Sequence, residues 1–331
     1  MDASRIAFTW LLALTLVAGI AGTAFGLNVV ATTTIVADIV RAVAGDDVNL
    51  VTLLPANADP HAFQATPNDL VAISNADVIF ISGAGLEADF ADILATGDAV
   101  IIDLSTRVAL RESADLDHGH EDHGDEAHAD DDHGDADHGD EDHNHADEGH
   151  THGAHDPHVW FDPSSVMIWA SASEQALAEF DPANAADYAG RATAYRGELA
   201  DLDLWIWDHV GRIPTGRRNL VTDHLVFGYF TARYGLRQVG AILPGFSTLS
   251  EPSAREIAEL IDTIGDLGVP AILVGSTVSP VLAESIASDT GTAVVTIYTG
   301  ALSDPTGPAP TYIEFMRFNT TAIVDALADA P

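Results

Sequence analysis

Short apolar runs alternate with amphipathic stretches along most of this 331-residue chain, and the alternation occurs in two separate blocks. The apolar runs have the length of buried strands, and the amphipathic stretches have helical periodicity. Strands that alternate with helices form parallel sheets covered by helices, because each parallel connection has to cross over the sheet. We therefore expect an α/β fold with two Rossmann-like lobes, each built on a parallel sheet.

The expected elements can be placed by residue range. The strands are expected at residues 27–33, 48–55, 77–83 and 99–105 in the first block, and at 218–223, 237–243, 270–275 and 293–298 in the second. The helices are expected at residues 35–45, 66–76, 162–180, 225–235, 251–268, 279–291 and 311–328. Thr66 is a suitable N-cap for the second of these helices, with Pro67 at its first position.

The two blocks are separated by residues 184–213, a stretch without proline. This stretch predicts one long helix of roughly 40 Å, at 1.5 Å per residue, which is suitable as a rigid connection. We therefore expect an N-terminal lobe over residues 27–183, a linking helix over 184–213 and a C-terminal lobe over 214–331.

The first 26 residues have the layout of a secretory signal peptide. Arg5 precedes an apolar run over residues 6–21, and small residues such as Gly22 and Ala24 follow it. An uncleaved membrane anchor is the alternative, since the run is near the lower length limit for spanning. In both cases the chain from Leu27 onward is expected in the periplasm or another extracytoplasmic space. Cysteine is absent, which excludes disulfides, thiolate metal sites and lipidation through an N-terminal cysteine.

A histidine-rich insert interrupts the first lobe at residues 118–155. It contains 11 of the 15 histidines, and the stretch 117–156 contains 16 acidic residues. No apolar residue larger than alanine occurs in the insert, so we expect it to be disordered. Imidazoles and carboxylates are both zinc ligands, and many equivalent ligands in series predict weak sites that collect metal, either to capture it or to regulate uptake. These weak sites are His118, His120, His123, His128, His133, His138, His143, His145, His150, His152 and His155.

The net charge of the chain is −38, and all 13 basic residues are arginine. Such a surface repels phosphate, so nucleic acids and anionic lipid headgroups are excluded as default partners. Divalent metal cations are favoured instead.

Four histidines lie outside the insert: His61, His158, His209 and His224. His61 and His224 follow expected strands, and His158 precedes an expected helix. Ligands bind at the carboxyl edge of parallel strands, so we expect these three histidines to hold one metal ion in the cleft between the lobes. Structural roles, such as helix capping, are the alternative. His209 lies within the long helix and is expected at the surface. Three nitrogen ligands favour Zn²⁺ over manganese, which prefers oxygen.

The chain resembles the zinc/manganese solute-binding proteins of ABC importers. The resemblance rests on NADPHAFQATPNDL (57–70), GAGLE (83–87), DPHVWFDP (156–163), VTDHLVFGYFTARYGL (221–236) and EPSAREIAELI (251–261). It implies a monomeric binding protein, not an enzyme, that captures Zn²⁺ and delivers it to a membrane permease with a cytoplasmic ATPase. It also implies that His61, His158 and His224 are the metal ligands. Manganese-type members usually have glutamate at the third position, so histidine there resembles the zinc type.

The chain departs from the family pattern where many members place an aspartate ligand, because Gly300 stands there. The fourth ligand could then be a water, Asp59, Asp304 or a histidine of the insert, and we favour water. Gln64 is a second departure, at a position where glutamate is common.

Three other functions compete with zinc import. Three histidines and a water also form catalytic zinc sites, but the chain contains no HExxH or GxSxG motif that would supply catalytic groups. A secreted zinc buffer without a transporter is the second alternative. A manganese or iron importer of the same family is the third.

Overall fold

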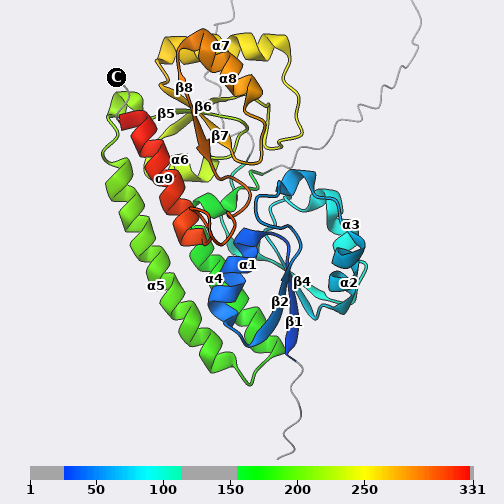
Figure 1. The fold of residues 1–331 in the computed structure, drawn as a ribbon. Coiled ribbons are helices and arrows are strands. Elements are labelled where there is room, and N and C mark those ends of the chain that lie inside the picture. The colour runs from blue at the N-terminus through cyan, green and yellow to red at the C-terminus, as the bar shows by residue number, and fades with distance from the viewer. Residues whose placement is uncertain (1–25, 113–154, 329–331) are drawn as a thin grey trace, which may run out of the picture.

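A computed structural model describes residues 26–112 and 155–328 of the chain (Figure 1). The predicted signal peptide lies outside these residues, as does the predicted insert apart from His155. In the described part of the chain, no helix is both long and apolar enough to cross a membrane.

Two four-stranded parallel sheets form the framework, and both have the same strand order. The N-terminal sheet contains β1 (Leu27–Ala31), β2 (Val48–Thr52), β3 (Val78–Ile81) and β4 (Val100–Asp103) in the order β2-β1-β3-β4. The C-terminal sheet contains β5 (Asn219–Thr222), β6 (Arg237–Ala241), β7 (Ala271–Gly275) and β8 (Ala293–Ile297) in the order β6-β5-β7-β8. The predicted α/β class and the two-lobe architecture are confirmed.

The helices lie close to their expected positions. They are α1 (Thr34–Ala44), α2 (Pro67–Asn75), α3 (Ala91–Leu94), α4 (Pro163–Phe180), α5 (Ala185–Val210), α6 (Gly228–Tyr234), α7 (Ala254–Leu267), α8 (Val281–Thr290) and α9 (Tyr312–Ala328). However, α7 begins three residues later than expected, after its N-cap Ser253, and α5 ends three residues earlier. The predicted cap of α2 is confirmed, since the Thr66 hydroxyl accepts the backbone N–H of Asp69. The short helix α3 was not predicted. α6 begins three residues later than expected, with Phe227 as its N-cap; the preceding segment bonds to other parts of the lobe, through Leu225 N–H to the Gly245 carbonyl and Phe227 N–H to the Gln238 side chain.

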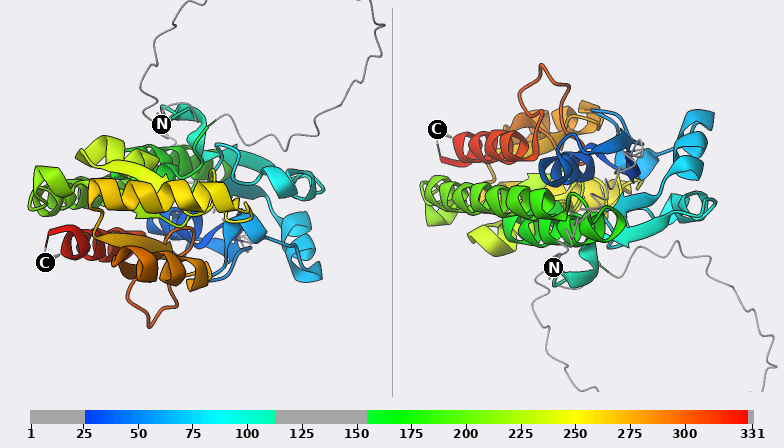
Figure 2. Two further views of the ribbon diagram at one scale, coloured as in Figure 1. Left: turned by 90° about the horizontal axis from the view of Figure 1, so that it is seen from above. Right: turned by 90° about the horizontal axis from the view of Figure 1, so that it is seen from below.

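Helix α5 runs along one side of the molecule, beside elements of both blocks (Figure 1). Its 26 residues span about 39 Å. It contacts α1, α4 and α9, and Figure 2 shows it next to α4 from below. Its buried residues recur every three or four positions, as one helix face requires: Tyr188, Ala192, Tyr195, Leu199, Leu202, Ile206 and Val210.

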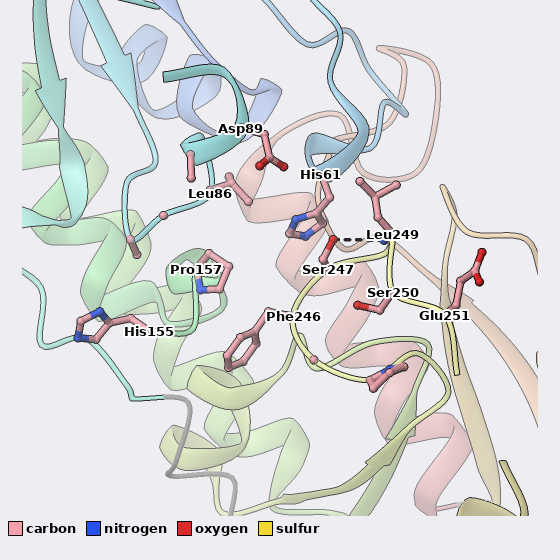
Figure 3. A pocket seen from close by; sticks show the side chains of 15 residues that line it. His61, Leu86, Asp89, His155, Pro157, Phe246, Ser247, Leu249, Ser250 and Glu251 are labelled. Carbon is pink, nitrogen blue, oxygen red and sulfur yellow. Dashed lines mark hydrogen bonds between the residues drawn. The ribbon is translucent and has the colours of Figure 1, made fainter. Parts of the chain in front are cut away.

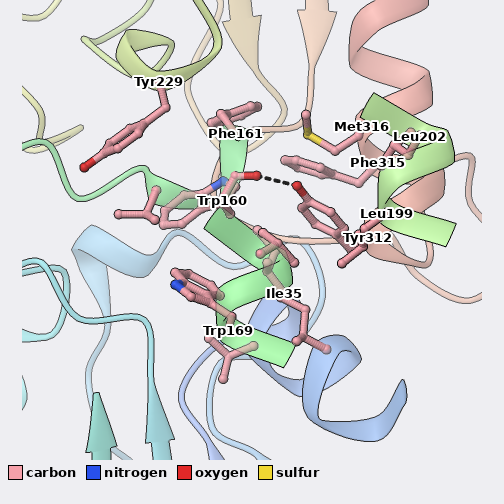
Figure 4. Close-up of a cluster of buried hydrophobic side chains, with 14 of the residues drawn as sticks. Ile35, Trp160, Phe161, Trp169, Leu199, Leu202, Tyr229, Tyr312, Phe315 and Met316 are labelled. Carbon is pink, nitrogen blue, oxygen red and sulfur yellow. Dashed lines mark hydrogen bonds between the residues drawn. The ribbon is translucent and has the colours of Figure 1, made fainter. Parts of the chain in front are cut away.

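One hydrophobic core joins the two sheets (Figure 4). Phe161, from the segment before α4, packs with its ring centroid 4.5 Å from that of Phe227 and 5.5 Å from that of Phe315. The Tyr312 hydroxyl donates to the backbone carbonyl of Trp160 at 2.6 Å. Separating the two lobes would expose these rings to water, so burial of apolar surface holds the lobes in a fixed relation.

Candidate metal centre

Three histidine side chains meet where the two lobes face each other. His61 Nε2 lies 3.4 Å from His158 Nε2, and one ring nitrogen from each of His61, His158 and His224 lies within 4.8 Å of the others. His158 and His224 are each only 1% exposed, whereas His61 is partly exposed. Among the described residues, no aspartate or glutamate belongs to this group. The group therefore presents nitrogen donors alone.

Each histidine reaches the group from a different kind of element. His61 lies in a single 3₁₀ turn (Pro60–Ala62), His158 directly precedes the turn Val159–Phe161, and His224 lies two residues after β5 ends. The expectation that all three occupy equivalent strand ends is therefore wrong for His158, which follows no strand in the described part of the chain. The loop that carries it is held in place by the aromatic core instead.

Buried aspartates orient two of the imidazoles. Asp156 Oδ1 accepts the Nδ1–H of His158 at 2.8 Å, and Asp223 Oδ1 accepts the Nδ1–H of His224 at 2.8 Å. Asp223 Oδ2 also accepts the backbone N–H of Gly275 at 2.7 Å. Donation from Nδ1 leaves the Nε2 lone pair free to bind a metal, and such aspartates fix the ring orientation. Sequence reasoning missed both aspartates, although each lies within two residues of its histidine.

The surroundings favour the neutral form of His61 and His158, which is the form of imidazole that binds metals. Burial, together with the nearby His224, lowers the pKa of His61 to about 4. Burial also lowers the pKa of His158 well below its ordinary value. Burial raises the pKa of Asp156 to about 7, and its Oδ2 has no hydrogen-bond partner among the described residues.

The two carboxylates considered as fourth ligands are engaged elsewhere. Asp59 Oδ1 caps the turn by accepting the backbone N–H of His61 at 3.0 Å, and its Oδ2 accepts the Thr248 hydroxyl at 2.5 Å. Asp304 is exposed and accepts the Asn57 side-chain amide at 3.1 Å. The structure therefore brings neither carboxylate into the histidine group.

The histidines predicted as weak sites lie outside the described residues, with the exception of His155. His155 is partly exposed and forms an isolated antiparallel bridge with Glu112. It does not belong to the histidine group.

The packing around Gly300 explains the departure noted in the sequence. A Cβ atom at Gly300 would lie 2.5 Å from Cδ of Pro60 and 2.7 Å from its Cγ, which is closer than real Cβ atoms come to carbon. The Pro60 ring thus occupies the space that a side chain at position 300 would need. Because Pro60 directly precedes His61, the close approach of Gly300 supports the turn that carries this histidine.

His209 is more enclosed than expected. Its ring stacks on Trp205 at a centroid distance of 3.7 Å, its Nδ1 bonds to the Trp205 carbonyl at 2.8 Å, and its side chain is 19% exposed. His209 therefore lies at the surface but is partly covered, because the neighbouring indole one turn away packs on one face of its ring.

The known proteins that this chain resembles are metal-binding proteins of bacteria. The chain is 27% identical to the manganese-binding lipoprotein MntA of Halalkalibacterium halodurans, over 92% of this chain and 89% of that protein. It is 28% identical to the iron-binding protein YfeA of Yersinia pestis, over 91% of this chain and 86% of that protein. The solved structure of the periplasmic zinc-binding protein TroA of Treponema pallidum superposes with a TM-score of 0.72 at 27% identity, covering 91% of this chain and 98% of that one.

A family model described as zinc-uptake complex component A, periplasmic, matches residues 29–326, which is nearly the whole described chain. Members of this family are substrate-binding proteins, not enzymes, and act with the permease and ATPase of an ABC transporter. With two parallel-sheet lobes and a match over residues 29–326, the chain belongs to this family of metal-binding proteins of ABC transporters.

Proposed function

We propose that this protein binds Zn²⁺ as its cargo through His61, His158 and His224 and delivers it to the permease of an ABC importer. The observation that carries the proposal is the donor set: three imidazole nitrogens within 4.8 Å of one another and no carboxylate in the group. Imidazole suits zinc, whereas manganese prefers sites rich in oxygen ligands. The relatives bear the names of manganese, iron and zinc binders, so the donor set of this chain is the argument for zinc.

Calorimetry with apo protein tests the ligands. Replacing His61, His158 or His224 by alanine should weaken the tightest Zn²⁺ site by more than about 100-fold, because each change removes a ligand outright and even outer partners contribute 10- to 100-fold. His209→Ala is the matched control, since it removes a histidine outside the group. Unchanged tight binding in all three ligand variants would contradict the assignment.

Metal selectivity needs a separate measurement. Protein purified without added metal should contain zinc, and competition between Zn²⁺ and Mn²⁺ should favour Zn²⁺. Tighter binding of Mn²⁺ than of Zn²⁺ would support the manganese alternative and overturn the zinc assignment.

We also propose that the protein acts outside the cytoplasmic membrane, after cleavage of residues 1–26. The apolar run over residues 6–21 and the small residues after it support this location. Mass spectrometry of the mature N-terminus tests it. We also propose that the chain divides into an N-terminal lobe (27–183), a linking helix (184–213) and a C-terminal lobe (214–331), since one sheet comes before α5 in the sequence and the other after it.

A further inference from the structure

A cavity of about 800 Å³ lies beside the histidine group and is bordered by both lobes (Figure 3). Its walls include the apolar side chains of Leu86, Pro157 and Phe246, with Ser247 and Ser250 as polar groups. Figure 3 shows His61 at the edge of this space, close to Ser247. One water molecule occupies about 30 Å³ in the liquid, so the cavity is far larger than a single water ligand requires. Its volume is in the range of small-molecule binding sites.

His61 is the member of the histidine group that borders this cavity. Zinc held by three protein ligands keeps a fourth position for an outside group. Of the three histidines, only His61 lines the cavity, while His158 and His224 are buried behind it. The ring of Pro60, the residue before His61, packs against Gly300, and neither residue lines the cavity.

The charges around the cavity select the kind of ligand. Asp89 and Glu251 line it, both are exposed, and none of the described residues that line it is an arginine. Apart from His61 and the partly exposed His155, the described lining contains no side chain that could carry positive charge, so anionic chelators would be repelled by mainly negative charge. Neutral or cationic compounds with a nitrogen donor would not, and their apolar parts fit walls such as Leu86 and Phe246.

We propose that this cavity binds a small nitrogen-donor compound, of the imidazole class, which fills the fourth coordination position of the bound metal. The proposal rests on the proposed metal site and deepens it, since the cargo becomes a metal ion together with a small ligand. In this ligand exchange, a neutral imidazole nitrogen donates its lone pair to the metal, and the water molecule that it replaces leaves.

The experiment uses full-length protein loaded with Co²⁺, whose visible absorption reports exchange of an oxygen donor for a nitrogen donor. Imidazole is titrated into the loaded protein, and citrate serves as the anionic counterpart. We expect a saturable change in the Co²⁺ spectrum with imidazole and none with citrate. Ser250→Trp places an indole ring in the cavity and should weaken imidazole binding roughly tenfold or more, because the ring takes up part of the space that the ligand would occupy.

The matched control is Ser279→Trp, the same substitution in a different cavity that Asp59, Leu243 and Val278 line. It should leave the imidazole titration unchanged. If Co²⁺ binds but imidazole causes no spectral change, or if both tryptophan variants behave alike, the cavity proposal is overturned while the metal site stands. If Co²⁺ itself does not bind, the proposed function fails first, so the two failures are distinguishable.

Discussion

Glu87 is a fully buried carboxylate whose ionisation should make the stability of this protein depend on pH. Its side chain accepts the Thr32 hydroxyl and the Ser82 backbone N–H at 2.8 Å each, and the Gly83 backbone N–H at 3.0 Å. Burial nevertheless raises the pKa of Glu87 from the ordinary value of 4.5 to about 7, against the opposing effect of these three donors. Loss of solvation therefore outweighs the hydrogen bonds.

The sign and size of the effect follow from proton linkage. Between pH 4.5 and 7 the folded protein holds a proton on Glu87 that the unfolded chain has released, so the free energy of unfolding falls as pH rises through this window. The contribution is complete below pH 4.5 and is lost above pH 7. A difference of two and a half pKa units corresponds to about 3 kcal/mol.

Urea denaturation of metal-free protein between about pH 4 and pH 8 measures this effect when wild type is compared with Glu87→Gln, which cannot ionise. The difference in free energy of unfolding between the two proteins should decrease by about 3 kcal/mol across the window. The difference is the informative quantity, because groups such as Asp156 titrate in both proteins.

Glu256→Gln is the matched control with the opposite sign. Hydrogen bonds from Ser253 lower the pKa of this exposed carboxylate, so its contribution to stability should be lost as pH falls instead of as pH rises. A pH-independent difference between wild type and Glu87→Gln would refute the reasoning, since it would mean that Glu87 ionises equally easily in both states.

Three further outcomes are expected. Gly300→Ala should weaken zinc binding by about tenfold or more, because its Cβ would displace Pro60 and the turn beside it, and calorimetry would detect this. Asp223→Asn should weaken zinc binding by about 10- to 100-fold without loss of fold, as followed by calorimetry and circular dichroism. Arg233→Ala should lower the free energy of unfolding by about 3 kcal/mol, because the Asp203 carboxylate loses two hydrogen bonds of 2.6 Å, and denaturation would measure the loss.

The strands were predictable because their signal is local. Each apolar run is long enough for a buried strand, and turn residues such as Pro55 and Gly83 bound the runs. The start of α6 was not predictable from periodicity, since the residues before it bond to segments further along the chain, as Leu225 does to the Gly245 carbonyl and Phe227 to the Gln238 side chain. The pairing of Pro60 with Gly300 likewise depends on contact between residues 240 positions apart, which no local pattern encodes.

The histidine group shows where sequence reasoning reaches its limit. Chemistry and spacing select His61, His158 and His224, but equivalent strand ends do not bring them together, because among the described residues no strand leads into His158. Its loop is fixed by contacts that cross between the lobes: the Trp160 indole N–H donates to the Thr299 carbonyl at 2.9 Å, and the Tyr229 hydroxyl donates to the Asp156 carbonyl at 3.2 Å.

These contacts place the histidine group within the interface between the lobes, so that its geometry depends on both lobes. The segment that carries His158 also supplies Trp160 and Phe161 to the shared core, so any movement that separates the lobes pulls His158 away from His224. Conversely, a cation held by all three imidazoles links the same surfaces that the core links. Binding should therefore stabilise the packed arrangement of the lobes by an amount set by the affinity for the metal, and a weakened core should lower that affinity in turn.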